Sequence, residues 1–131
     1  MILFLRALLF VGGLFYAILG VGFLFDPAGS GAEFGLMAHD AHGLTTLRAD
    51  FTAFFVVAGG CMIWGGWARK GDPLLVTAAL MVLALAGRFV GLATDGSFAG
   101  FWPPMVVEAV TAILALIASR MLPHTALEPD S

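Results

Sequence analysis

Four long apolar stretches constrain this chain more than any other feature of its sequence. They cover residues 3–25, 44–67, 74–94 and 101–122, and each is close to the ~20 residues that a helix needs to cross a ~30 Å hydrocarbon core. Of the 131 residues, 60% are hydrophobic and 11% are charged, so a water-soluble domain could not cover its apolar surface. The sequence therefore predicts one all-α domain over residues 1–131, an integral membrane four-helix bundle.

The segments between these stretches have the composition of helix boundaries. Turn-forming and capping residues lie there: Asp26-Pro27, Gly43, Asp72-Pro73 and Pro103-Pro104. The first stretch is too long for a signal peptide, and no small-residue cleavage site follows it, so we expect it to be retained. Each boundary thus agrees with a helix that begins or ends at the membrane surface.

The basic residues predict which side each end of the helices faces. Four of the six Lys and Arg residues lie at the N-terminal end, between the second and third stretches, and at the C-terminal end: Arg6, Arg69, Lys70 and Arg120. With four crossings these places share one side of the membrane. The positive-inside rule makes that side cytoplasmic, so we expect an N-in/C-in orientation.

Two charges inside the apolar stretches are the strongest candidates for a site. Arg88 lies about 9 Å below the outer end of the third stretch and Glu108 about 10 Å below the outer start of the fourth, at ~1.5 Å per residue. Arg48 and Asp50 lie about 6 and 9 Å below the outer start of the second. An unpaired charge at such depth costs several kcal/mol. We therefore predict a neutral cluster of these four residues in the outer leaflet, which either binds a ligand or fixes the packing of the helices.

Two histidines in the long outer loop are candidates for a lid over this cluster. His39 and His42 could also form a metal site with Glu33 and Asp40, but the spacing is a weak match to known sites, and we expect solvated loop histidines and no metal. The single cysteine, Cys61, lies in the middle of the second stretch and cannot form an internal disulfide.

Short motifs resemble those of a known group of proteins. Leu47-Arg48-Ala49, the run from Gly87 to Gly91 (GRFVG) and the early glutamate Glu108 are similar to those of small bacterial four-span membrane proteins known as a domain of unknown function. In plan, that group resembles the DoxX-like four-helix proteins. The resemblance implies a four-helix bundle in the bacterial inner (cytoplasmic) membrane, and it implies no catalytic activity.

Several functions agree with this pattern. We expect an accessory or ligand-binding bundle whose partners are membrane lipid and a lipid-like or quinone-like ligand, without a cofactor and without enzymatic activity. The alternatives are a small proton-coupled transporter, or a structural or assembly subunit of a larger membrane complex, and the chain could also form a homo-oligomer. Haem binding needs a buried histidine, and all three histidines lie outside the stretches. A formal net charge of −3 without a basic patch argues against nucleic acid.

Overall fold

The computed structural model describes residues 1–124, and within that range the chain contains helices and no strands. Its elements are α1 (Ile2–Phe25), α2 (Pro27–Glu33), α3 (Ala41–Thr46), the π-helical turn η1 (Leu47–Phe51), α4 (Thr52–Ala68), α5 (Asp72–Asp95) and α6 (Trp102–Met121). The helices α3, η1 and α4 form one continuous segment, Ala41–Ala68. The prediction of an all-α fold with four long apolar helices is confirmed.

The four long helical segments have the length and composition of membrane spans. They are Ile2–Phe25, Ala41–Ala68, Asp72–Asp95 and Trp102–Met121, and each contains one of the apolar stretches in the sequence. These four helices are those of a multi-pass membrane protein. The short helix α2 was not predicted. It forms because Pro27 occupies its first turn and the Asp26 carboxylate accepts a hydrogen bond from the backbone N–H of Gly29, at 3.0 Å.

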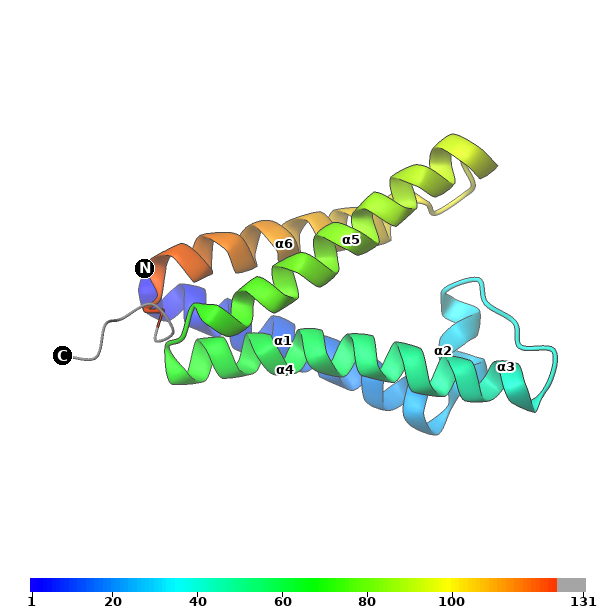
Figure 1. The fold of residues 1–131 in the computed structure, drawn as a ribbon, viewed down its shortest axis with the longest axis horizontal. Helices are drawn as coiled ribbons and strands as arrows, with labels where there is room; N and C mark the ends of the chain where they lie inside the picture. The colour runs from blue at the N-terminus through cyan, green and yellow to red at the C-terminus, as the bar shows by residue number, and fades with distance from the viewer. Residues whose placement is uncertain (125–131) are drawn as a thin grey trace.

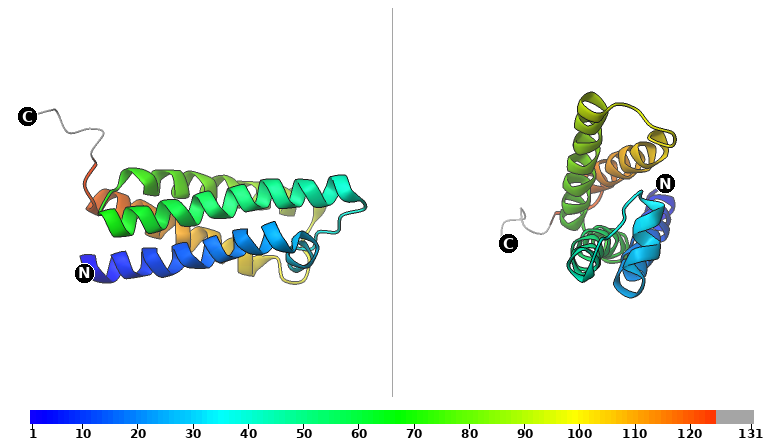
Figure 2. Two further views of the ribbon diagram at one scale, coloured as in Figure 1. Left: turned by 90° about the horizontal axis from the view of Figure 1, so that it is seen from below. Right: turned by 90° about the vertical axis from the view of Figure 1, so that its right-hand side faces the viewer.

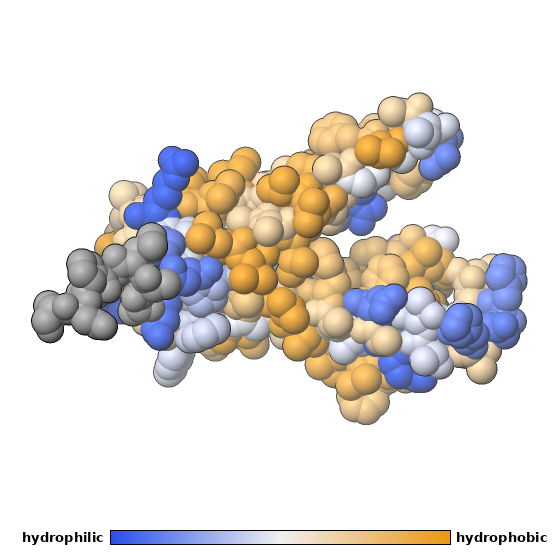
Figure 3. Space-filling model, viewed as in Figure 1, coloured by the Kyte–Doolittle hydropathy of each residue, from blue (hydrophilic) through white to orange (hydrophobic). Residues whose placement is uncertain are grey.

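The long helices form two pairs that diverge from one end of the molecule. Helix α1 packs along α4, and α5 packs along α6; we call these pairs the α1/α4 arm and the α5/α6 arm (Figures 1 and 2). The arms meet at the joined end, where the N-terminus, the α4–α5 turn and the last turn of α6 lie. They separate toward the open end, where the space-filling view shows open space between them (Figure 3).

Contact between backbones holds the α1/α4 arm together. A Cβ atom at Gly13 would lie 2.7 Å from the carbonyl oxygen of Gly59, and one at Gly59 would collide with the carbonyl oxygen of Gly13. Only glycine fits at these positions. In lipid, where helices gain little from hydrophobic association, such close approach provides the van der Waals contact that holds them together.

Polar contacts to the main chain close the joined end. The Arg6 side chain donates from Nε to the carbonyl oxygen of Gly66, at 2.7 Å, and from Nη2 to that of Trp67, at 3.1 Å, which ties the start of α1 to the end of α4. The backbone N–H of Gly71 donates to the carbonyl oxygen of Pro123, at 2.8 Å, which ties the α4–α5 turn to the chain after α6.

His124 strengthens the same connection. Its Nδ1 lies 2.5 Å from Asp72 Oδ1 and its Nε2 lies 2.7 Å from the carbonyl oxygen of Ser119. Both ring nitrogens face acceptors, so the imidazolium form is favoured, and the hydrogen bond to Asp72 followed by the one to Ser119 raises the pKa of His124. This contribution to stability is complete below the unfolded-state pKa of about 6.5 and is lost as the pH rises through the folded pKa.

The close contact of α1 with α4 predicts opposite outcomes at two adjacent glycines. Gly59→Ala should lower the free energy of unfolding by roughly 1–3 kcal/mol, because its Cβ would overpack the Gly13 backbone. Gly60→Ala should change it by less than about 1 kcal/mol, because no atom lies within 4 Å of the added Cβ. Unfolding of both variants in detergent measures the difference. Equal effects of the two substitutions would contradict the close packing.

Candidate functional site

Arg88 of α5 and Glu108 of α6 form an ion pair, as the sequence analysis predicts. Arg88 Nε lies 2.8 Å from Glu108 Oε1 and 2.9 Å from Oε2. The Glu108 side chain is 11% exposed and that of Arg88 is 33% exposed. The two helices are antiparallel neighbours, so residues at the same depth from the open end can face each other, and the pair ties α5 to α6.

A second polar contact lies one helical turn deeper. Thr111 follows Glu108 by three residues on the same face of α6, and its Oγ1 lies 2.8 Å from the hydroxyl oxygen of Tyr16 on α1. Both residues are buried. This hydrogen bond connects the two arms directly below the ion pair, so Glu108 lies near the depth at which the arms begin to separate.

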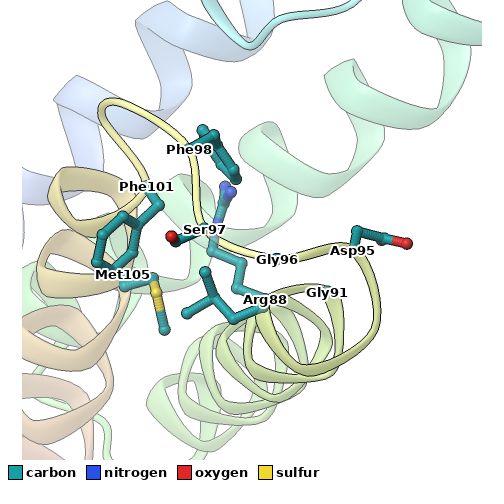
Figure 4. Close-up of a pocket in the computed structure, with 9 residues that line it drawn as sticks. Arg88, Gly91, Asp95, Gly96, Ser97, Phe98, Phe101 and Met105 are labelled. Atoms are coloured by element: carbon teal, nitrogen blue, oxygen red, sulfur yellow. The ribbon is translucent and has the colours of Figure 1, made fainter.

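A cavity of about 290 Å³ lies on the open-end side of the ion pair. Its lining comes from α5, α6 and the loop between them: Arg88, Gly91, Leu92, Asp95, Gly96, Ser97, Phe98, Phe101 and Met105. In Figure 4 the Arg88 side chain extends from α5 toward Phe98, whereas Asp95 points away from it. The cavity thus combines a cationic group and a hydroxyl with walls of aromatic and aliphatic side chains.

The geometry of the ion pair leaves part of Arg88 available to this cavity. Both hydrogen bonds to Glu108 come from Nε. Among residues 1–124, neither Nη1 nor Nη2 of Arg88 has a hydrogen-bond partner. These two nitrogens are not buried, because every buried side-chain nitrogen or oxygen in that range has a partner. The terminal nitrogens therefore carry donors that an acceptor in the cavity or water can use.

The other two charges of the predicted cluster do not join this pair. Arg48 donates from Nε to the carbonyl oxygen of Leu24 at the end of α1, at 2.9 Å, and Asp50 is exposed. Both belong to η1 on the α1/α4 arm, which diverges from the α5/α6 arm at this depth. Counting residues along a helix gives depth but not the distance between helices, so the structure brings together two of the four residues and not all four.

The predicted lid residues also lie apart from the cavity. His39 precedes α3 and His42 lies in its first turn; both are exposed, and neither lines the cavity. The segment that covers the cavity is the α5–α6 loop, through Phe98 and Phe101. Sequence reasoning missed this loop, although its two phenylalanines were a usable signal. Within the described residues, no three His, Cys, Asp or Glu side chains gather as a metal site would require.

The ion pair is tested by a double substitution. Glu108→Gln should lower the free energy of unfolding by about 1–3 kcal/mol, because it leaves the Arg88 charge without its partner. The loss is smaller than for a fully buried pair, because the Arg88 side chain is partly exposed. Adding Arg88→Met should recover much of that loss by removing the charge. Thermal unfolding in detergent measures both. A single variant that melts like the wild type, or a double variant with no recovery, would contradict the pairing.

Comparison with known proteins gives a family but no activity. No curated protein and no solved structure matches the chain. A family model described as a domain of unknown function matches residues 4–119. This range covers most of the 131 residues, including all of α4 and α5 and nearly all of α1 and α6. The chain therefore belongs to the family known as domain of unknown function DUF4345.

Proposed function

We propose that this protein is a membrane-embedded binding protein for an amphipathic molecule, lipid-like or quinone-like, whose head group carries acceptor oxygens. The observation that carries the proposal is that the nitrogens of the Arg88 side chain have different surroundings. Its Nε is held by Glu108, while its terminal nitrogens remain available at an apolar cavity. In this assignment Arg88 binds the head group and Glu108 is a positioning residue.

The composition of the cavity supports this class of ligand. Small-molecule sites are concave and mostly apolar, with a few polar groups that orient the ligand. Here Arg88 and Ser97 provide donors, while Phe98, Phe101 and Met105 provide apolar surface. Water competes poorly in apolar surroundings, so a hydrogen bond from the guanidinium to a phosphate, carboxylate or carbonyl oxygen is stronger there than at an aqueous surface. The separated arms offer a route for an apolar tail from the bilayer.

Two alternatives make different demands on the same residues. A proton-coupled transporter needs a carboxylate that exchanges protons with both sides, whereas Glu108 is mostly buried and paired with Arg88. A structural or assembly subunit needs the ion pair but has no use for the cavity. Filling the cavity without touching the pair therefore separates ligand binding from a structural role.

Two open glycines on α5 provide that experiment. A Cβ at Gly91 or at Gly87 would meet no atom within 4 Å, but only Gly91 lines the cavity. Gly91→Leu should fill the cavity and leave the protein folded, because leucine is a better helix former than glycine by roughly 1 kcal/mol. We expect native mass spectrometry after gentle extraction to find an amphipathic species bound to the wild type, and its occupancy to fall at least tenfold in Gly91→Leu.

The matched controls are Gly87→Leu and Arg48→Met. Both should keep the bound species, because Gly87 lies outside the cavity and Arg48 lies on the other arm. Arg88→Met should lose it. A wild-type protein without any bound species, or a Gly91→Leu variant that retains it at the level of Gly87→Leu, would overturn the proposal.

We also propose that the joined end faces the cytoplasm of a bacterial inner membrane, in the plan of the DoxX-like proteins. The basic residues Arg6, Arg69, Lys70 and Arg120 favour that side under the positive-inside rule. In a Cys61→Ser background, a membrane-impermeant maleimide added to intact spheroplasts should label Ser97→Cys and spare Arg69→Cys. Labelling of Arg69→Cys alone would reverse the orientation.

A further inference from the structure

A second hollow lies at the joined end, far from the Arg88 cavity, and has its own chemistry. It measures about 280 Å³ and is formed by the first half of α1 and the end of α4: Leu3, Arg6, Ala7, Phe10, Val11, Gly66 and Trp67. We call it the Arg6 groove. Leu3, Ala7, Phe10 and Val11 follow helical spacing along one side of α1, so the groove runs lengthwise along that helix. It is open to the outside of the bundle, where Trp67 is 74% exposed.

The groove has a charged end and an apolar body. Arg6 donates from Nε and Nη2 to main-chain carbonyls of α4, and among residues 1–124 its charge has no acidic partner. These bonds fix the position of the Arg6 side chain, while its Nη1 has no protein partner in that range. The Phe10 and Trp67 rings lie against each other with centroids 6.1 Å apart, which forms an aromatic wall.

Further basic residues lie at the same end of α4. Lys70 Nζ lies 5.7 Å from the centroid of the Trp64 ring, and Trp64 precedes Trp67 by one helical turn on α4. Arg69 follows directly after α4. The only carboxylate that the described residues place at this end is Asp72, which bonds His124. Among residues 1–124, the charged side chains at the joined end therefore sum to a positive charge.

We propose that the Arg6 groove binds a phospholipid with an anionic head group from the adjacent leaflet. The phosphate would meet Arg6 near the membrane surface, and an acyl chain would lie along Ala7, Phe10 and Val11 in the hydrocarbon region. Anionic lipid fits because each basic residue near a membrane surface favours it, and because aromatic side chains settle at the interface. This site does not depend on the ligand proposed for the Arg88 cavity.

Tryptophan fluorescence gives a direct test, because Trp67 lines the groove. In a Trp64→Phe/Trp102→Phe background, Trp67 is the sole tryptophan. The full chain is reconstituted into vesicles with brominated phosphatidylglycerol or with brominated phosphatidylcholine carrying the same chains. Bromine quenches the fluorescence of a tryptophan that it contacts. We expect phosphatidylglycerol to associate at Trp67 roughly fivefold more strongly, the factor that corresponds to one basic residue near an anionic surface.

Two variants separate the groove from general surface charge. Arg6→Gln should bring the preference close to one, whereas Arg120→Gln, which removes the same charge from the last turn of α6, should leave it unchanged. Ala7→Phe should remove the preference with all charges retained, because Ala7 is exposed and its added ring would occupy the groove. Ala7→Phe therefore tests the groove even if Arg6→Gln does not fold.

Three results would overturn the inference. The first is equal quenching by the two lipids in the parent protein. The second is an equal loss of preference in Arg6→Gln and Arg120→Gln, which would assign the effect to diffuse charge. The third is an undiminished preference in Ala7→Phe.

Discussion

The ion pair between Arg88 and Glu108 is the interaction on which the open end of this structure depends. A charge in hydrocarbon costs several kcal/mol unless a partner compensates it, so each of these residues requires the other once α5 and α6 are placed in a membrane. The pair fixes the depth at which α5 faces α6. It thereby places Phe98, Phe101 and Met105 around the end of the Arg88 side chain. Among residues 1–124, the terminal nitrogens of that side chain have no hydrogen-bond partner.

The two ends of the bundle are held together by different contacts. At the joined end, side chains and backbone N–H groups bond main-chain carbonyls of neighbouring elements, through Arg6, Gly71 and His124. Among the described residues, the side-chain hydrogen bond between the arms that lies closest to the open end is that of Tyr16 with Thr111. The arms are therefore closely packed at the joined end and leave open space between them at the open end.

The sequence predicts the length of each span and the depth of each charge, but not which groups meet between helices. The four long helices and the Arg88–Glu108 pair could be predicted because hydropathy sets the length of a span, and residue counts set the depth of a charge. Depth alone could not exclude Arg48 from the cluster, because its distance from Arg88 depends on the divergence of the arms. The acceptor of Arg48 is a main-chain carbonyl, that of Leu24, and any residue type supplies one. The same holds for His124, whose hydrogen bond to Asp72 joins residues 52 positions apart and leaves no local pattern.

A glycine such as Gly59 gives no sign in the sequence of whether it faces a backbone, as it does here, or open space, as Gly60 does.

An experimental density map of the full chain in lipid nanodiscs, enlarged with a rigid antibody fragment, tests the role of Arg88 most directly. We expect non-protein density in contact with the Arg88 guanidinium, bounded by Phe98 and Phe101, with Glu108 still bonded to Arg88 Nε. A map in which the arms close so that side chains of α4 fill that space, or in which both Nη atoms of Arg88 bond protein groups, would contradict it.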